Sequence, residues 1–140
     1  MCYGDYRHFR NGPQNIMDKN EFISIRKRLA KTQKELAALL GVSLKAISSY
    51  EQGWRNIPGH VERQLLFLLA KKLDDSSGNC WDIRNCSDDV KRSCPAWEFK
   101  SGNLCWFING TICDSDAKKT WRDKIAICRN CQVFKTQLGL

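Results

Sequence analysis

The sequence predicts a mainly α-helical fold class, in which a five-helix domain is followed by a small, irregular, Cys-rich domain. Apolar residues recur every three to four positions in the first half, as on one face of a helix. A short polar stretch follows, and seven of the eight cysteines of the 140-residue chain then crowd into its last part. We therefore expect an N-terminal arm at 1–17, a helical domain at 18–75, a linker at 76–79 and a Cys-rich domain at 80–140.

The stretch from residue 32 to residue 58 predicts two short helices around a tight turn. Thr32 and Glu35 have the spacing of a reciprocal cap at the start of a helix. Gly41 stands where a helix must end in a left-handed residue, and Ser43 then offers the cap of a second helix. Two helices joined by a short glycine turn form the helix-turn-helix geometry, whose second helix enters the major groove of DNA.

The pattern T-Q-x-E-L-A-x-x-x-G-V-S-x-x-x-I-S-x-x-E-x-G-x-R-x-x-P of residues 32–58 resembles the phage-repressor-like (XRE) helix-turn-helix family. The resemblance extends over the N-terminal half, and it implies a repressor-like fold that binds a double-stranded DNA operator. It also implies that Arg26 pairs with Glu51 and that Gln33 contacts a phosphate. The residues assigned to DNA binding are Gln33, Ser43, Leu44, Lys45, Ser48, Ser49 and Arg55.

The charge of the chain favours a polyanionic partner. The net charge is +8, of which residues 1–75 contribute +5 (13 basic, 8 acidic) and residues 76–140 contribute +3 (10 basic, 7 acidic). No apolar run reaches the ~18 residues of a membrane span, and the N-terminal residues lack an apolar signal segment. We therefore expect a cytoplasmic protein without a membrane partner. Because one small domain offers little contact with DNA, we also expect a homodimer.

Cysteines in a cytoplasmic chain indicate metal or redox chemistry rather than a disulfide framework. A Cys-Trp-x-Ile motif occurs at 80–83 and again at 105–108, and C-x-x-C occurs at 128–131. The layout resembles the small "two-CW" domain of bacterial and archaeal regulatory and sensor proteins. A C-x-x-C pair can hold one ion from a single turn, so Cys128 and Cys131 are the first expected ligands. We expect four or more ligands from the set Cys80, Cys86, Cys94, Cys105, Cys113, Cys128 and Cys131.

Ligation by cysteine alone suits an iron–sulfur cluster or a tetrahedral zinc ion, and spacing does not separate the two. Seven thiols exceed the needs of one structural zinc, and neighbouring tryptophans keep water from the sulfurs, as in a cluster pocket. These features favour a 4Fe-4S cluster, with zinc as the alternative.

The motifs favour regulation over catalysis. The sequence has no Ser/His/Asp set, paired carboxylates or phosphate-binding glycine loop, so we expect no enzyme and no catalytic residue. We expect a sequence-specific transcriptional regulator whose Cys-rich domain senses redox state or metal. The alternative is a DNA-binding protein whose Cys-rich domain is a static zinc scaffold for dimerisation or partner docking.

Overall fold

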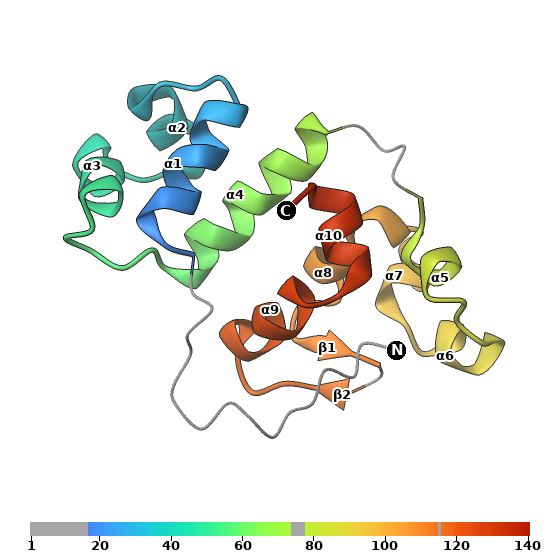
Figure 1. Cartoon of the computed structure of the whole chain (residues 1–140). Coiled ribbons are helices and arrows are strands. Elements are labelled where there is room, and N and C mark those ends of the chain that lie inside the picture. Colours follow the sequence, from blue (N-terminus) through green and yellow to red (C-terminus); the bar gives the residue numbers. More distant parts are fainter. Residues whose placement is uncertain (1–16, 74–77, 115) are drawn as a thin grey trace. The chain divides into compact units, whose positions relative to one another are not determined.

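The computed structural model describes residues 17–73, 78–114 and 116–140, which divide into two compact units between Lys72 and Leu73 (Figure 1). The predicted arm at 1–17 lies outside the described residues except for Met17, which is buried. The predicted linker at 76–79 is described only at its last two residues. The four predicted domain ranges therefore stay predictions.

The first unit consists of helices joined by short connections. They are α1 (Lys19–Arg28), α2 (Gln33–Leu40), α3 (Leu44–Gln52) and α4 (Gly59–Lys72). Residues 17–73 thus contain four helices, whereas the sequence analysis predicted five. Residues 60–72 include neither glycine nor proline, so nothing interrupts α4 over its 14 residues.

Capping side chains and a glycine mark the ends of these helices, and the predicted signals of α2 are confirmed. The Asp18 side chain caps α1 by accepting from the backbone N–H of Glu21 at 2.8 Å. Thr32 and Glu35 form a complete capping box at the start of α2. Gly41 ends α2 with φ of +66°, a left-handed conformation that costs a residue with a Cβ more than it costs glycine.

The core of the first unit is built from the apolar stripes of its helices. Phe22 of α1 meets Tyr50 of α3 edge to face, with ring centroids 5.8 Å apart. Ala37 of α2 is also buried, and its small side chain suits the close contact of α2 with α3. The other buried residues of these helices include Ile25, Leu36, Leu40, Ile47, Val61, Leu65, Leu66 and Leu69.

The second unit has more regular structure than the sequence analysis predicted. Its elements are α5 (Cys80–Ile83), α6 (Asp88–Arg92), α7 (Pro95–Glu98), the 3-10 helix η3 (Gly102–Leu104), α8 (Cys105–Ile108), β1 (Ile112–Cys113), β2 (Asp116–Ala117), α9 (Trp121–Arg129) and α10 (Gln132–Leu138). The two strands form an antiparallel hairpin in which Cys113 pairs with Asp116. Both Cys-Trp-x-Ile motifs form a one-turn helix that begins at the cysteine, namely α5 and α8.

Aromatic and small residues pack the second unit. Trp106 of α8 is fully buried, and its ring meets that of Phe134 of α10 edge to face at 5.8 Å. Gln137 of α10 is buried and donates to the carbonyl oxygen of Gly102 at 2.7 Å. A Cβ at Gly102 would lie 2.6 Å from the ring of Trp81, so only glycine allows this approach.

Candidate functional site

The turn between α2 and α3 is fixed by backbone and cap hydrogen bonds. The backbone N–H of Val42 donates to the carbonyl of Ala37 at 3.0 Å, which closes the end of α2. Ser43 Oγ accepts from the backbone N–H of Ala46 at 3.0 Å and so starts α3. The Ser43 side chain, which the sequence analysis assigned to DNA binding, therefore caps α3.

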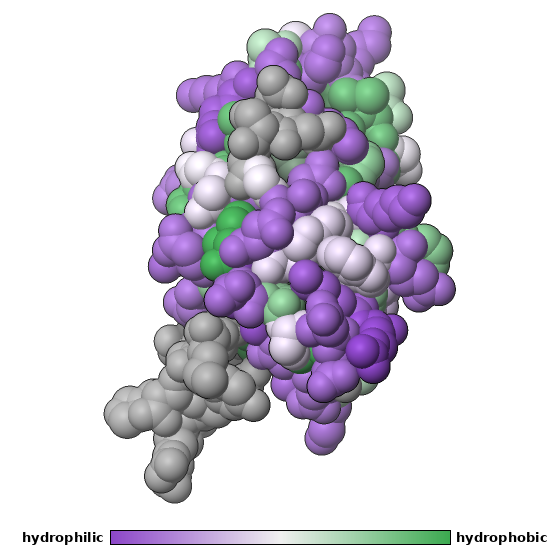
Figure 2. All heavy atoms as spheres, turned by 90° about the vertical axis from the view of Figure 1, so that its right-hand side faces the viewer, coloured by the Kyte–Doolittle hydropathy of each residue, from purple (hydrophilic) through white to green (hydrophobic). Residues whose placement is uncertain are grey.

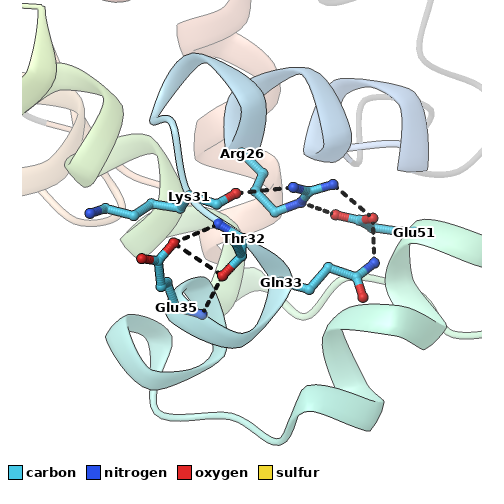
Figure 3. Close-up of polar contacts among 6 residues, drawn as sticks. All are labelled: Arg26, Lys31, Thr32, Gln33, Glu35 and Glu51. Carbon is cyan, nitrogen blue, oxygen red and sulfur yellow. Dashed lines mark hydrogen bonds and ion pairs between the residues drawn. The ribbon is translucent and has the colours of Figure 1, made fainter.

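A polar network joins the first three helices (Figure 3). Arg26 Nη2 donates to Glu51 Oε2 at 3.2 Å, and Arg26 Nη1 donates to the carbonyl of Lys31 at 3.0 Å. The predicted pairing of Arg26 with Glu51 is thus confirmed. Gln33 Nε2 donates to the same Glu51 oxygen at 2.7 Å, which holds the Gln33 amide beside α3. One hydrogen of that amide is used inside the unit, and its second hydrogen is the one that a phosphate could accept.

One face of α3 is exposed and polar. Leu44 and Lys45 are exposed in the first turn, and Leu44 retains 49% of its accessible surface. Ser48 is half-buried, and its hydroxyl accepts from Nε2 of the exposed Gln52 at 2.8 Å. These four residues have the spacing of one helix face. Gln52 was not predicted, although it follows Ser48 by four residues and could have been found from that spacing.

Two other predicted residues occupy different positions. Ser49 is buried, and its hydroxyl donates to the carbonyl of Lys45 at 2.8 Å, so this side chain is not presented on the exposed face. Arg55 is exposed in the loop between α3 and α4, where its backbone N–H donates to the carbonyl of Ser49 at 3.3 Å. The neighbouring Trp54 is 79% exposed. The loop therefore presents a cation and an aromatic ring to solvent.

All seven cysteines of residues 80–140 line a single cavity of about 50 Å³ in the second unit. They come from six helices and strands and one turn, which are spread over more than fifty residues. Cys80 and Cys105 begin α5 and α8, and Cys94 and Cys131 are the N-cap residues of α7 and α10. The remaining three, Cys86, Cys113 and Cys128, lie after α5, in β1 and in α9.

The environment of the thiols sets their protonation. The Cys105 thiol donates a hydrogen bond to the sulfur of Cys80. This hydrogen bond raises the pKa of Cys105 and lowers the pKa of Cys80. Burial raises the pKa of Cys105 further. Burial also raises the pKa of Cys128 to about 11, against the opposing charge of Lys124. A metal that binds Cys105 and Cys128 must therefore displace their protons.

The wall of the cavity carries polar groups that sequence analysis did not identify. Lys124 of α9 is buried, and its ammonium donates to the carbonyl of Gly110 at 3.1 Å and to that of Trp106 at 3.5 Å. The indole N–H of Trp106 has no acceptor among the described residues. Asn109 Nδ2 donates to the sulfur of Cys94 at 3.6 Å. A lysine is normally predicted to be exposed, so no local pattern marks Lys124 as a cavity residue.

The donor set fits a soft metal, but the thiols do not converge on one point. In the parts of the chain that the structure describes, no three His, Cys, Asp or Glu side chains form a group that could hold an ion. A tetrahedral zinc with bonds of about 2.3 Å needs its sulfurs within roughly 3.8 Å of one another. A cluster distributes its thiolates over separate irons and therefore needs them farther apart.

The outer surface beside the cavity is polar. The side of the molecule that carries α5 and α6 is mainly hydrophilic, with small hydrophobic spots between the polar residues (Figure 2). Trp97, which also lines the cavity, stacks edge to face on Trp81 at 4.9 Å, and the Lys91 ammonium lies 4.9 Å from its ring centroid. Trp81 also packs against the buried cluster that contains Cys80, whereas Trp97 is 44% exposed. None of the helices in 17–73, 78–114 and 116–140 is long and apolar enough to cross a bilayer.

Comparison with known proteins identifies the first unit only. No curated protein and no solved structure matches the chain. One family model, described as Helix-turn-helix, matches residues 23–74, a range that begins within α1 and includes α2, α3 and α4. This match supports the predicted XRE-type segment and leaves the Cys-rich half without a family. Residues 23–74 therefore form a helix-turn-helix segment of the type carried by DNA-binding regulators.

Proposed function

We propose that the protein is a transcriptional regulator that reads a double-stranded DNA operator through α3. The family match over residues 23–74 is the observation that carries this proposal. The exposed face of α3 supplies two kinds of base contact. Lys45 can donate to guanine, and Leu44 can contact a thymine methyl group. Gln33 and Arg55 are the proposed phosphate contacts, which position the helix without reading sequence.

The predicted DNA-binding set is reduced in this proposal. Ser49 is left out because its hydroxyl is used within α3, and Ser43 is kept only for its cap. Gln52 is added because it lies on the exposed face next to Ser48. The proposed base-reading face therefore consists of Leu44, Lys45, Ser48 and Gln52.

We further propose that the thiol cavity binds a metal centre and that the centre regulates DNA binding. Seven thiols around one cavity support a thiolate-bound metal. Seven thiols exceed the four that one tetrahedral zinc ion uses, which favours a 4Fe-4S cluster, with zinc as the alternative. The assembly is a cytoplasmic homodimer in which each chain contributes one reading helix.

Anaerobic purification tests the metal proposal. The expected result is a coloured protein that contains iron and acid-labile sulfide, and that loses its colour and changes its DNA affinity after oxidation. A colourless protein with one zinc per chain, and with the same DNA affinity before and after chelation, would instead establish a static scaffold. Titration with an operator fragment and with a scrambled fragment at the same salt concentration measures DNA binding in each state.

A further inference from the structure

Lys124 is a buried cation whose partners do not balance its charge. Its side chain lies on α9 and the residue is only 2% exposed. Its ammonium donates to the carbonyls of Gly110 and Trp106, and its charge lowers the pKa of Cys128. No carboxylate among the described residues forms an ion pair with it. Burial of an ammonium costs several kcal/mol unless an anion compensates, so the fold has to supply one.

A negative charge that balances Lys124 would have to lie in the cavity that the seven thiols line. This residue lines the thiol cavity, and its charge acts on Cys105 and Cys128. A second cation of the cavity wall, Arg84, already has a carboxylate partner in Asp114. A third cation of the wall, Lys91, is only half-buried and lies over the ring of Trp97, so Lys124 is the buried cation of the wall that lacks a carboxylate partner among the described residues.

A purely structural role does not explain a charge at this position. The two carbonyls that Lys124 contacts are neutral acceptors, and a neutral donor would satisfy them without the cost of burying a charge. The buried indole N–H of Trp106, in the same wall, also lacks an acceptor among the described residues. A negatively charged acceptor in the cavity would balance Lys124 and could also accept from the indole N–H, whereas Asn109 Oδ1 of the same wall is a buried acceptor without a donor among the described residues.

A metal held by four thiolates meets this requirement. Four thiolates carry four negative charges, and neither a zinc ion nor a 4Fe-4S core neutralises them fully. The sulfur atoms of such a centre accept hydrogen bonds from nearby donors, which tune its properties. The cavity wall thus has the positive charge and the hydrogen-bond donors that would balance an anionic metal–thiolate centre.

We propose that Lys124 is the counter-charge of a metal–thiolate centre in the thiol cavity, with Cys105 and Cys128 among the ligands nearest to it. The inference rests on the proposed function, because it assumes that the thiols bind a metal. In this role Lys124 is a positioning residue that favours the thiolate form of its neighbours. It also raises the reduction potential of a redox-active centre, since a nearby cation stabilises the more negative state.

The test compares Lys124→Met and Lys124→Arg with the wild-type protein, all purified without oxygen. Lys135→Met is the matched control, because Lys135 is an exposed lysine on α10. Metal affinity is measured by competition with a chelator, and thermal unfolding is followed with the metal and after its removal. Lys124→Met is expected to lower metal affinity about 10- to 100-fold, whereas Lys124→Arg and Lys135→Met retain it. If iron is bound, the reduction potential of Lys124→Met becomes more negative.

Thermal unfolding separates a counter-charge from a structural donor. After removal of the metal, Lys124→Met is expected to be at least as stable as the wild type, because a buried unpaired charge has been removed. With the metal, it is expected to be less stable. A loss of stability in both states, with unchanged metal affinity, would show a structural donor and overturn the inference. A wild-type protein that takes up no metal would overturn both this inference and the proposed metal centre.

Discussion

Lys45 and Arg55 carry the same charge but lie in different parts of the first unit. Lys45 lies in the first turn of α3, on the face that includes Ser48 and Gln52. Arg55 lies in the loop that follows, next to Trp54. A contact from a recognition helix reads base edges, whereas a contact from a loop usually reaches the phosphate backbone. The two residues should therefore have different effects on sequence preference.

We expect Lys45→Ala to reduce the preference for the operator over a scrambled sequence by ~1–3 kcal/mol. Arg55→Ala should weaken binding to both sequences alike and reduce the salt dependence by about one unit of slope. Titrations at several salt concentrations measure both effects, with Lys72→Ala, an exposed lysine at the end of α4, as the control. An equal loss on both sequences for Lys45→Ala would contradict its base-reading role.

The helices of the first unit could be predicted from sequence because their boundaries are encoded locally. Thr32 with Glu35, Gly41 and Ser43 mark three helix ends through groups that the backbone itself requires. The second unit offers fewer such signals. Its helices have four to nine residues, a length at which packing rather than local propensity holds a helix in place. The capping box of Thr120 and Asp123 was a readable signal for α9 that the analysis missed.

Most residues of the candidate sites could be predicted from the sequence, but their arrangement in space could not. The thiols could be singled out because cysteine is uncommon and their motif repeats. The arrangement of all seven around one cavity depends on contacts between distant elements, and it could not be read from spacing. For the same reason, Ser49 matched a base-reading position in the sequence pattern, although its hydroxyl turns back onto α3.

The close packing of η3 against α5 gives a prediction at the scale of these elements. Gly102→Ala would place a Cβ 2.6 Å from Trp81 and 2.8 Å from the Cβ of Asn79. Such overpacking typically costs ~1–3 kcal/mol, because the neighbours must shift. Chemical denaturation of the variant should show this loss, while Gly110→Ala tests the cost of a left-handed φ without a neighbour within 4 Å. Unchanged stability of Gly102→Ala would show that Trp81 moves freely.

At the scale of the whole molecule, the metal centre should contribute to the folding of the second unit alone. A metal that binds only the folded state adds its binding free energy to folding. We expect Cys131→Ser, or removal of the metal, to lower the unfolding temperature of residues 78–140 while that of α1 to α4 stays unchanged. Circular dichroism and limited proteolysis of the same samples measure this. A second unit that is equally stable with and without metal would contradict the prediction.

A second prediction at this scale concerns assembly on DNA. A single helix-turn-helix segment contacts few base pairs, so tight specific binding requires two copies. We expect a two-fold dimer whose half-sites lie about one helical turn, or ~34 Å, apart. Footprinting shows the spacing, and light scattering shows the mass in solution. A monomer that protects one unrepeated half-site would refute the dimer.

The C-x-x-C motif lies at the junction between the last two helices, so its two cysteines connect the end of α9 to the start of α10. Cys128 is in the last turn of α9, Cys131 caps α10, and the backbone N–H of Cys131 donates to the carbonyl of Cys128 at 2.9 Å. A group that binds both sulfurs would therefore fix the angle between α9 and α10. Gln137 lies near the C-terminal end of α10, and its amide also donates to the carbonyl of Gly78 at 3.5 Å. Such a group would thus be linked, over the length of one short helix, to Gly78, the first residue described after the gap at 74–77.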